Sequence, residues 1–320
     1  MKFDAVIFDI DNVLIDTRAS YTDCIRKTVE TYLISHLKFQ SSRNPLLSRQ
    51  DVETFKRAGG FNDDWDTCYG LLLYLLSLKI KKCTLLELAR VKNIPKFVLQ
   101  IKQRPLGIKG IERLLRPHLE RCLAMTSLRA SCLPAGRKRS NLKIKEMVSL
   151  KRIAEIFQRF YLSDFVWNEK PLIPKSFLKD LKRRGFRLGI VTGRNREEAE
   201  FALRRFKMDF FIDAMMTTDE TPKDLKKPHP YGLLKIAAKL GRNLRYLYVG
   251  DLPDDILAAK KAGKEIKIAS CGYLGASTLQ REMKREFKKE KADYICKEPK
   301  QLLKIIVQRT VYGVQREKWA

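Results

Sequence analysis

The fold is signalled first by one stretch near the N-terminus, Ala5-Val6-Ile7-Phe8-Asp9-Ile10-Asp11. Its first four residues are a short apolar run, which is typical of a fully buried strand. Buried strands of α/β sheets present side chains to the crevice at their carboxyl ends. Because side chains two apart share one face of a strand, we expect Asp9 and Asp11 to point into one pocket and repel each other. A divalent cation or phosphate chemistry would make that repulsion tolerable. The alternative is an Asp-rich turn or helix cap, which would suit Asp16-Thr17.

Two further apolar runs, residues 186–191 and 246–249, also end in polar side chains. The first is followed by Thr192-Gly193-Arg194 and the second by Gly250-Asp251-Leu252-Pro253-Asp254-Asp255, and each leads into a predicted helix, at residues 199–206 and 256–262. Between them lies the loop Lys226-Lys227-Pro228-His229-Pro230. A Mg²⁺-phosphate site needs hard oxygen ligands for the cation, and positive charge and donors for the phosphoryl oxygens. Each piece alone is a common turn or helix start, but together and in this order they predict such a site.

These four pieces resemble the haloacid dehalogenase-like hydrolases, specifically the phosphatase branch that includes phosphoglycolate phosphatase. The resemblance covers the start of the chain and residues from about 165 to 308. It implies that Asp9 is the nucleophile and Asp11 the general acid and base. It also implies a lysine that holds the charge of nucleophile and phosphate, at Lys227 or at the adjacent Lys226.

The resemblance further implies which residues bind phosphate and metal. Thr192 with Gly193 would bind the phosphate, and Arg194 would either reach it or start the following helix in solvent. The expected Mg²⁺ site comprises Asp9, Asp11, Asp251 and Asp255, with Asp251 as a direct ligand, and Asp254 stands where the family often has Asn or Asp. The three histidines lack metal-ligand spacing: His36, His118 and His229.

The implied reaction is Mg²⁺-dependent hydrolysis of a phosphate monoester of a small metabolite. A carboxylate that attacks phosphorus forms an aspartyl-phosphate and splits one slow displacement into two faster ones. Asp11 would protonate the leaving oxygen and then deprotonate the hydrolytic water. Dehalogenases lack this second acid, because a halide leaving group needs no proton. Two alternatives stay open: phosphoryl transfer to a sugar, as in phosphohexose mutases, and a phosphatase-like protein whose basic cap binds RNA or another polyanion.

The expected architecture is α/β, a doubly wound parallel sheet with an inserted helical cap domain. Residues 1–16 and 165–310 would form the catalytic core, residues 17–164 the cap, and residues 311–320 a C-terminal tail. In the cap, apolar periodicity predicts helices at residues 20–33, 65–78, 85–91, 108–123 and 144–161. In the core it predicts helices at residues 175–184 and 301–307 and a last strand at residues 292–295.

Substrate specificity would come from cap residues. One conspicuous cap segment is Gly59-Gly60-Phe61-Asn62-Asp63-Asp64-Trp65. Its Asn and Asp side chains could accept hydrogen bonds from a substrate. The competing interpretation is a helix end at Gly59-Gly60 and an N-cap at Asn62 or Asp63, with Trp65 packed in the cap.

Composition favours an intracellular enzyme. Seven scattered cysteines without a Cys-x-x-Cys pattern predict reduced thiols in the cytoplasm. The apolar stretch at residues 69–78 is too short to span a bilayer. A cleaved signal is not expected, because cleavage would remove Asp9 or its strand.

The formal net charge of +28 is not explained by the resemblance. Fourteen basic and three acidic residues concentrate in residues 102–152, including Arg137-Lys138-Arg139. Such a segment could bind nucleic acid, but it contains no Phe, Tyr or Trp to stack on bases. A small phosphorylated metabolite is therefore the expected partner, and no membrane is expected.

Overall fold

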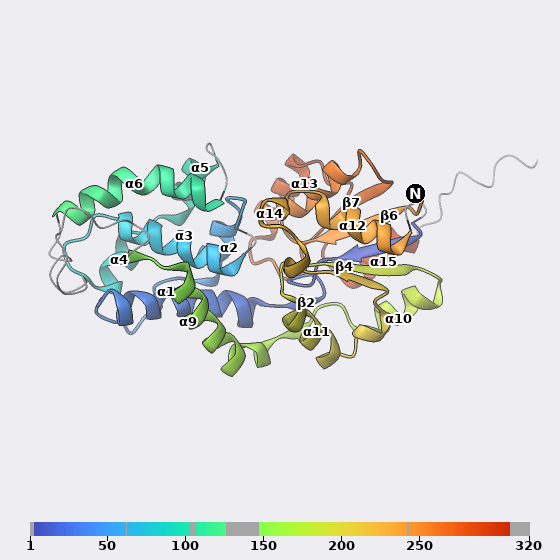
Figure 1. The fold of residues 1–320 in the computed structure, drawn as a ribbon, viewed down its shortest axis with the longest axis horizontal. Coiled ribbons are helices and arrows are strands. Elements are labelled where there is room, and N and C mark those ends of the chain that lie inside the picture. Colours follow the sequence, from blue (N-terminus) through green and yellow to red (C-terminus); the bar gives the residue numbers. More distant parts are fainter. Residues whose placement is uncertain (1–2, 62, 103–106, 126–146, 242, 308–320) are drawn as a thin grey trace, which may run out of the picture. The chain divides into compact units, whose positions relative to one another are not determined.

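The computed structural model describes residues 3–61, 63–102, 107–125, 147–241 and 243–307, with side chains left undescribed at residues 120–125. The chain forms two compact units. One comprises Met1–Asp16 with Lys170–Ala320, and the other Thr17–Glu169. Element labels follow Figure 1. The expected second boundary, after Asp164, lies five residues earlier than the one observed, because Val166 packs into the core of the helical unit.

The first unit is built on a six-stranded sheet with the order β5-β4-β1-β6-β7-β8, and each pair of neighbouring strands is parallel. The strands are β1 (Ala5–Phe8), β4 (Arg187–Val191), β5 (Ala214–Met216), β6 (Tyr246–Gly250), β7 (Ile268–Tyr273) and β8 (Tyr294–Cys296). The strands expected at residues 186–191, 246–249 and 292–295 lie within two residues of β4, β6 and β8. The sequence interpretation missed β5 and β7.

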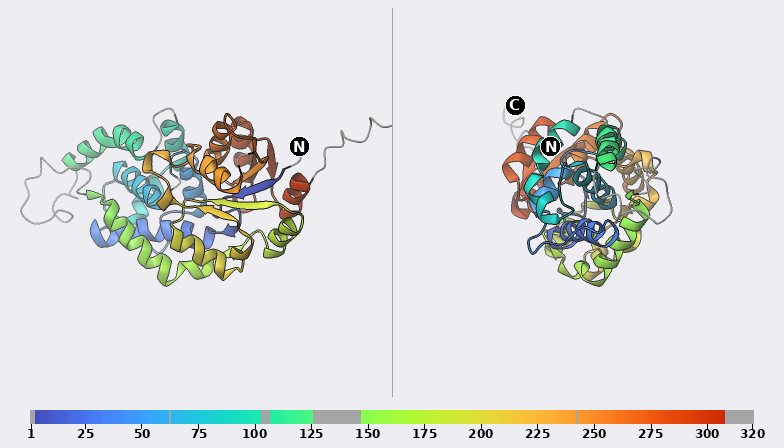
Figure 2. Two further views of the ribbon diagram at one scale, coloured as in Figure 1. Left: turned by 45° about the vertical axis from the view of Figure 1, so that its right-hand side comes forward. Right: turned by 90° about the vertical axis from the view of Figure 1, so that its left-hand side faces the viewer.

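Strand β1 is buried throughout because helices cover both faces of the sheet (Figures 1 and 2). Its side chains alternate: Val6 and Phe8 join one apolar cluster, and Ala5 and Ile7 join another. The first cluster includes residues of α10 (Lys175–Arg183), α11 (Arg196–Arg205) and α15 (Pro299–Val307). The second includes residues of α12 (Tyr231–Leu240) and α13 (Pro253–Ala262). Met283 and Phe287 of a further helix, α14 (Gln280–Lys289), belong to a separate small apolar cluster. The unit is therefore a doubly wound α/β sheet, as expected from the sequence.

Two short strands, β2 (Ile15–Asp16) and β3 (Lys170–Pro171), pair antiparallel. They lie where the chain leaves the sheet unit and where it returns to it.

The second unit is helical and has its own apolar core, which runs from Tyr21 to Val166. The α-helices described in this unit are α1 (Asp23–Thr31), α2 (Arg49–Lys56), α3 (Asp64–Ser77), α4 (Leu85–Val91), α5 (Ile94–Ile101), α6 (Gly107–Met125) and α9 (Leu150–Ser163). Short π-helical turns flank α1, and the hydroxyl of Thr17 makes no capping hydrogen bond at the first of them, so the cap expected at Asp16-Thr17 is not formed by this side chain.

One helix in this unit begins later than the sequence predicts, for a local reason. The helix expected from Ile144 is α9, and it begins at Leu150 because the Ser149 side chain accepts a hydrogen bond from the backbone N–H of Arg152.

The segment Arg137-Lys138-Arg139 lies outside the described residues.

The glycine pair of the cap segment follows the end of a helix. After α2, Gly59 and Gly60 adopt positive φ values of 82° and 74°. Asp63 caps α3 through a 2.9 Å bond from the backbone N–H of Trp65, and Trp65 packs against the core of the helical unit. These contacts agree with the capping interpretation for Asp63, and Asn62 lies outside the described residues.

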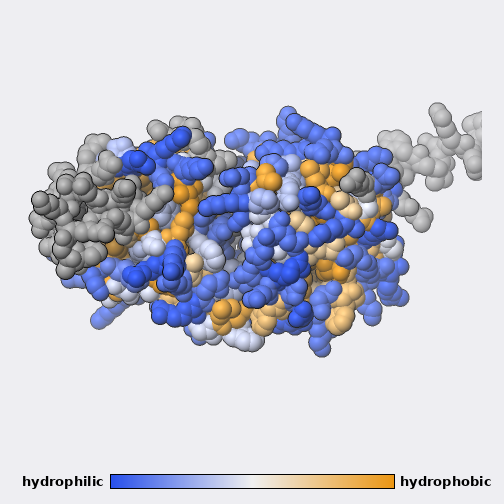
Figure 3. Space-filling model, in the orientation of Figure 1, coloured by the Kyte–Doolittle hydropathy of each residue, from blue (hydrophilic) through white to orange (hydrophobic). Residues whose placement is uncertain are grey.

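No helix in the described part of the chain is both long enough and apolar enough to cross a membrane. On the face drawn in Figure 3, hydrophilic residues predominate and apolar residues are scattered among them.

Candidate active site

The sheet topology explains why the polar segments meet. Strand β1 lies between β4 and β6, with Phe8 paired to Ile190 and to Val249. Asp9, Thr192 and Asp251 directly follow these three strands. Because parallel strands end at the same edge of a sheet, residues more than 180 positions apart in the sequence converge there.

Lys227 contacts two carboxylates and one tyrosine at this edge of the sheet. Its Nζ donates hydrogen bonds to Asp9 Oδ2 at 2.6 Å, to Asp255 Oδ1 at 2.8 Å and to the Tyr248 hydroxyl at 3.1 Å. An ammonium group has three protons, so these contacts match its full donor capacity. Although burial opposes the charge, Asp255 and Asp9 raise the pKa of Lys227 well above its ordinary value, which keeps the ammonium charged.

Asp255 is held firmly in the first turn of α13. Its Oδ1 accepts from Lys227 and from the Tyr248 hydroxyl at 2.8 Å, and its Oδ2 accepts from the backbone N–H of Leu252 at 3.0 Å. The absence of a side chain at Gly250 makes room for it, because a Cβ there would lie 2.3 Å from the Cβ of Asp255. The sequence interpretation assigned no role to Gly250 or Tyr248, and only the contacts of Asp255 reveal them.

Three carboxylates form the group that could hold a metal. Oxygen atoms of Asp9, Asp251 and Asp255 lie within 4.8 Å of one another. Burial raises the pKa of Asp9 to about 6, despite Lys227, with Asp255 and Asp11 adding to the shift. Removal from solvent, together with Asp255 and Asp9, raises the pKa of Asp251 well above its usual range. The raised pKa values of Asp9 and Asp251 mean that their ionised forms are disfavoured here unless further positive charge is present.

The charges of these carboxylates and of Lys227 indicate whether Mg²⁺ would fit the site. If all three carboxylates are ionised, they carry two more negative charges than the Lys227 ammonium neutralises. The donor set consists of hard oxygen atoms, which suit Mg²⁺. The residues present therefore fit a divalent cation.

Asp11 does not belong to this group of three among the described residues. Its Oδ1 instead accepts from Arg194, at 2.8 Å from Nε and 2.7 Å from a terminal nitrogen. The expected metal set of Asp9, Asp11, Asp251 and Asp255 is thus brought together without Asp11. The physical reason is that the chain turns sharply after β1, where Ile10 O accepts backbone hydrogen bonds from residues 13, 14 and 15, so the alternation of a strand no longer applies.

Arg194 is a buried partner and does not start a helix in solvent. Its side chain is 1% exposed, and α11 begins two residues later, with Asn195 as its N-cap. Its backbone N–H donates to Thr192 Oγ1 at 3.2 Å. Thr192 is itself buried, and Gly193 lies in the bend between β4 and α11.

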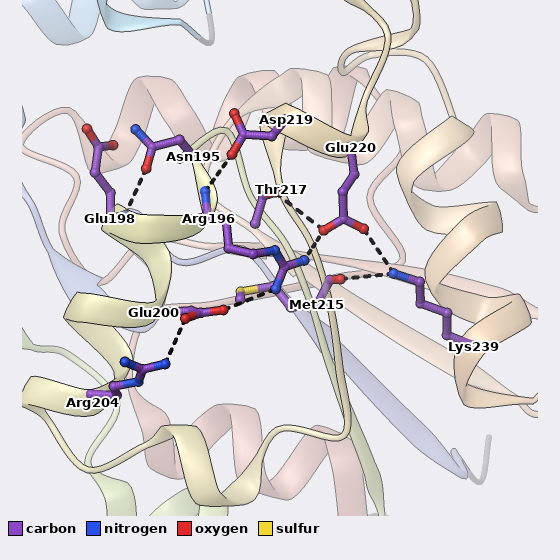
Figure 4. Close-up of polar contacts among 10 residues, drawn as sticks. All are labelled: Asn195, Arg196, Glu198, Glu200, Arg204, Met215, Thr217, Asp219, Glu220 and Lys239. Carbon is purple, nitrogen blue, oxygen red and sulfur yellow. Dashed lines mark hydrogen bonds and ion pairs between the residues drawn. The ribbon is translucent and has the colours of Figure 1, made fainter.

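Charged side chains connect the elements around this bend (Figure 4). Glu220, in the loop after β5, accepts from Arg196 at the start of α11 and from Lys239 of α12, the latter at 3.0 Å. The carboxylate of Asp219 accepts from the backbone N–H of Arg196 at 2.7 Å. The network ties the loop that precedes Lys227 to the helix that follows Thr192.

Comparisons with known proteins agree with this arrangement. The family model of haloacid dehalogenase-like hydrolases matches residues 3–263. A putative pyrophosphatase PpaX of Caldanaerobacter subterraneus subsp. tengcongensis is 37% identical over 134 residues, which are 41% of this chain and 56% of that protein. A phosphoglycolate phosphatase of Haemophilus influenzae is 31% identical over 139 residues, 42% of this chain and 61% of that protein. The matches thus cover less than two thirds of these relatives.

Similarity in fold extends over nearly the whole chain. The crystal structure of a putative phosphoglycolate phosphatase from Lactobacillus delbrueckii subsp. bulgaricus superimposes with a TM-score of 0.59. It covers 97% of this chain and 100% of that one at 16% sequence identity, which is a likeness of fold.

Proposed function

The chain belongs to the haloacid dehalogenase-like hydrolases, and on that premise we propose that it is a Mg²⁺-dependent phosphatase that hydrolyses phosphate esters of small metabolites. The observation that carries the proposal is the contact between Lys227 and Asp9 inside a group of three carboxylates. This arrangement offers a carboxylate nucleophile and a fixed positive charge at one position. Relatives named pyrophosphatase and phosphoglycolate phosphatase support phosphorus chemistry.

The first half-reaction starts at Asp9. A carboxylate oxygen of Asp9 attacks phosphorus, the bond between phosphorus and the ester oxygen breaks, and an aspartyl-phosphate forms. Lys227 holds Asp9 Oδ2 and opposes the growing negative charge. Asp11 gives a proton to the leaving oxygen, and Arg194 fixes the direction of its carboxylate.

The second half-reaction regenerates the nucleophile. Asp11 takes a proton from water, which attacks the phosphorus of the aspartyl-phosphate and releases inorganic phosphate. Thr192 and the backbone at Gly193 would hold the phosphoryl oxygens. Mg²⁺, held by Asp9 and Asp251 with Asp255 in support, would supply further positive charge to the phosphoryl group.

A substrate panel tests the proposal. The purified chain would be assayed for phosphate release from 2-phosphoglycolate, pyrophosphate, hexose phosphates and p-nitrophenyl phosphate, with Mg²⁺ and with EDTA. We expect turnover of at least one ester with Mg²⁺, and little in EDTA. The matched control is Asp9→Asn, which keeps the shape of the side chain but forms no acyl-phosphate, so its rate should fall by more than about 10³-fold.

Two results would contradict the proposal. Full activity of Asp9→Asn would exclude the aspartyl-phosphate, and full activity in EDTA would exclude the cation. Conversion of one hexose phosphate into another without release of phosphate would favour the mutase alternative.

A further inference from the structure

Asn12 adopts a backbone conformation that few residues tolerate. Its φ is 57°, in the left-handed region, which Gly, Asn and Asp adopt more readily than other residues. The surrounding turn is tightly held: the backbone N–H of Asn12 donates to Ile15 O at 2.7 Å, and the flanking residues Val13 and Leu14 are fully buried. The turn therefore fixes the backbone of Asn12 and the direction in which its side chain leaves the chain.

The Asn12 side chain reaches the metal-binding group. Its Nδ2 donates to Asp251 Oδ2 at 3.2 Å, across 239 positions of sequence. Asp251 lies beside two other carboxylates, Asp9 and Asp255. An amide N–H is a donor that interacts favourably with such a carboxylate and adds no charge to the site.

We propose that Asn12 is a positioning residue for the cation site, which it serves by fixing the orientation of the Asp251 carboxylate; this rests on the proposed function. A hydrogen bond to one carboxylate oxygen restricts rotation of the group and so fixes the place of the other oxygen. Partners of this kind behind a metal ligand change metal affinity by about 10- to 100-fold when they are removed.

The residue type at position 12 also argues for a role of the side chain. Glycine would meet the conformational demand without strain. The other described non-glycine residues with positive φ are all exposed lysines: Lys38, Lys207 and Lys291. Asn12 differs from them because its side chain donates to a carboxylate of the candidate site.

Replacement by glycine separates the side chain from the backbone. Asn12→Gly permits the same φ and removes the amide, and Lys291→Gly is the matched control, since its φ is also 57° and it lies on the exposed surface. Mg²⁺ binding would be followed by calorimetric titration and by the rise in melting temperature with Mg²⁺. We expect Asn12→Gly to bind Mg²⁺ about tenfold more weakly, and Lys291→Gly to bind it as the wild type does.

A second variant replaces the hydrogen bond between position 12 and Asp251 by an electrostatic repulsion. Asn12→Asp also tolerates this conformation, but it places a carboxylate in place of the donor beside Asp251. We expect a lower melting temperature than the wild type in EDTA, because the two carboxylates repel, and a larger rise on addition of Mg²⁺.

The outcomes separate the two proposals. Wild-type Mg²⁺ affinity in Asn12→Gly, together with weak binding in Asp251→Asn, would overturn the role of Asn12 and leave the cation site standing. Absence of any Mg²⁺ response in the wild-type protein would overturn the cation site and the role of Asn12 with it.

Discussion

Individual side chains in this site are held by opposing charges. Lys227 lies between Asp9 and Asp255, and Arg194 binds Asp11 through two nitrogens. The two acids that the sequence places two residues apart therefore have different basic partners. In the proposed mechanism, this separation would place the nucleophile Asp9 beside one cation and the proton carrier Asp11 beside another.

The role of Asp11 can be tested by the choice of leaving group. Asp11→Asn should slow hydrolysis of alkyl phosphates about 10²-fold or more, and slow p-nitrophenyl phosphate much less, because nitrophenolate departs without a proton. Initial rates of the variant and the wild type on both substrates measure this. The ratio of the rates on the two substrates within the variant is informative even if loss of the ion pair with Arg194 lowers the stability of the protein. Equal losses on both substrates would make Asp11 a structural residue.

Neighbouring secondary-structure elements of the sheet unit are joined by the carboxylate of Asp293, whose side chain is 37% exposed. Asp293, before β8, accepts from the backbone N–H of Ser270 on β7 at 2.8 Å, from the Ser270 hydroxyl at 2.8 Å and from Lys260 of α13 at 2.7 Å. Burial opposes the charge of Asp293, but these hydrogen bonds outweigh it and lower its pKa.

The pH dependence of this contact follows from the sign of the shift. A carboxyl whose pKa is lower in the folded protein stabilises it above the unfolded pKa, and this contribution is lost as the pH falls through the folded pKa. Asp293→Asn should therefore reduce the free energy of unfolding at neutral pH by less than about 1 kcal/mol, because solvent screens this partly exposed contact. The difference from wild type, measured by urea denaturation, should be constant above about pH 5 and shrink as the pH falls below it. A difference that grows on acidification would contradict this.

At the scale of the whole molecule, the helical unit has a core of its own. All residues of its apolar cluster, from Tyr21 to Val166, lie within Thr17–Glu169. The sheet unit is assembled from two segments of the chain, because β1 is inserted between β4 and β6. Of the two units, only the helical one is continuous in sequence.

The helical unit should fold alone. A fragment of residues 17–169 should show helical circular dichroism and a single cooperative unfolding transition, because its buried apolar residues contact one another. Residues 170–320 alone should not form the sheet, since the central strand β1 is missing. A non-cooperative transition of the 17–169 fragment would show that its core needs the rest of the chain.

The net charge of +28 leads to a further expectation for the whole protein. We expect binding to RNA or DNA weaker than about 1 μM at physiological salt, because the basic excess is spread through the chain and residues 102–152 lack aromatic side chains for stacking. Fluorescence anisotropy with labelled RNA at two salt concentrations measures this. Tighter binding, lost on replacing Arg137, Lys138 and Arg139 by Ser, would favour the polyanion alternative.

The sequence by itself determined the α/β class and the order of three strand ends, because short apolar runs followed by polar residues are local signals. It also determined which residues stand at those ends: Asp9, Thr192 and Asp251 directly follow β1, β4 and β6. Strands β5 and β7 were not predicted from the sequence. Strand β5 has only three residues, and β7 contains small residues such as Ser270 and Gly272.

Only the tertiary structure decided the contacts among these residues. It brought Lys227 onto Asp9, where the sequence left Lys226 and Lys227 open, and it paired Asp11 with Arg194. It also placed the Asn12 side chain within hydrogen-bond distance of Asp251. Each of these pairs is separated by more than 180 positions, so its geometry depends on the parallel arrangement of the strands and on one tight turn after β1. No local pattern in the sequence encodes the direction in which such a side chain points.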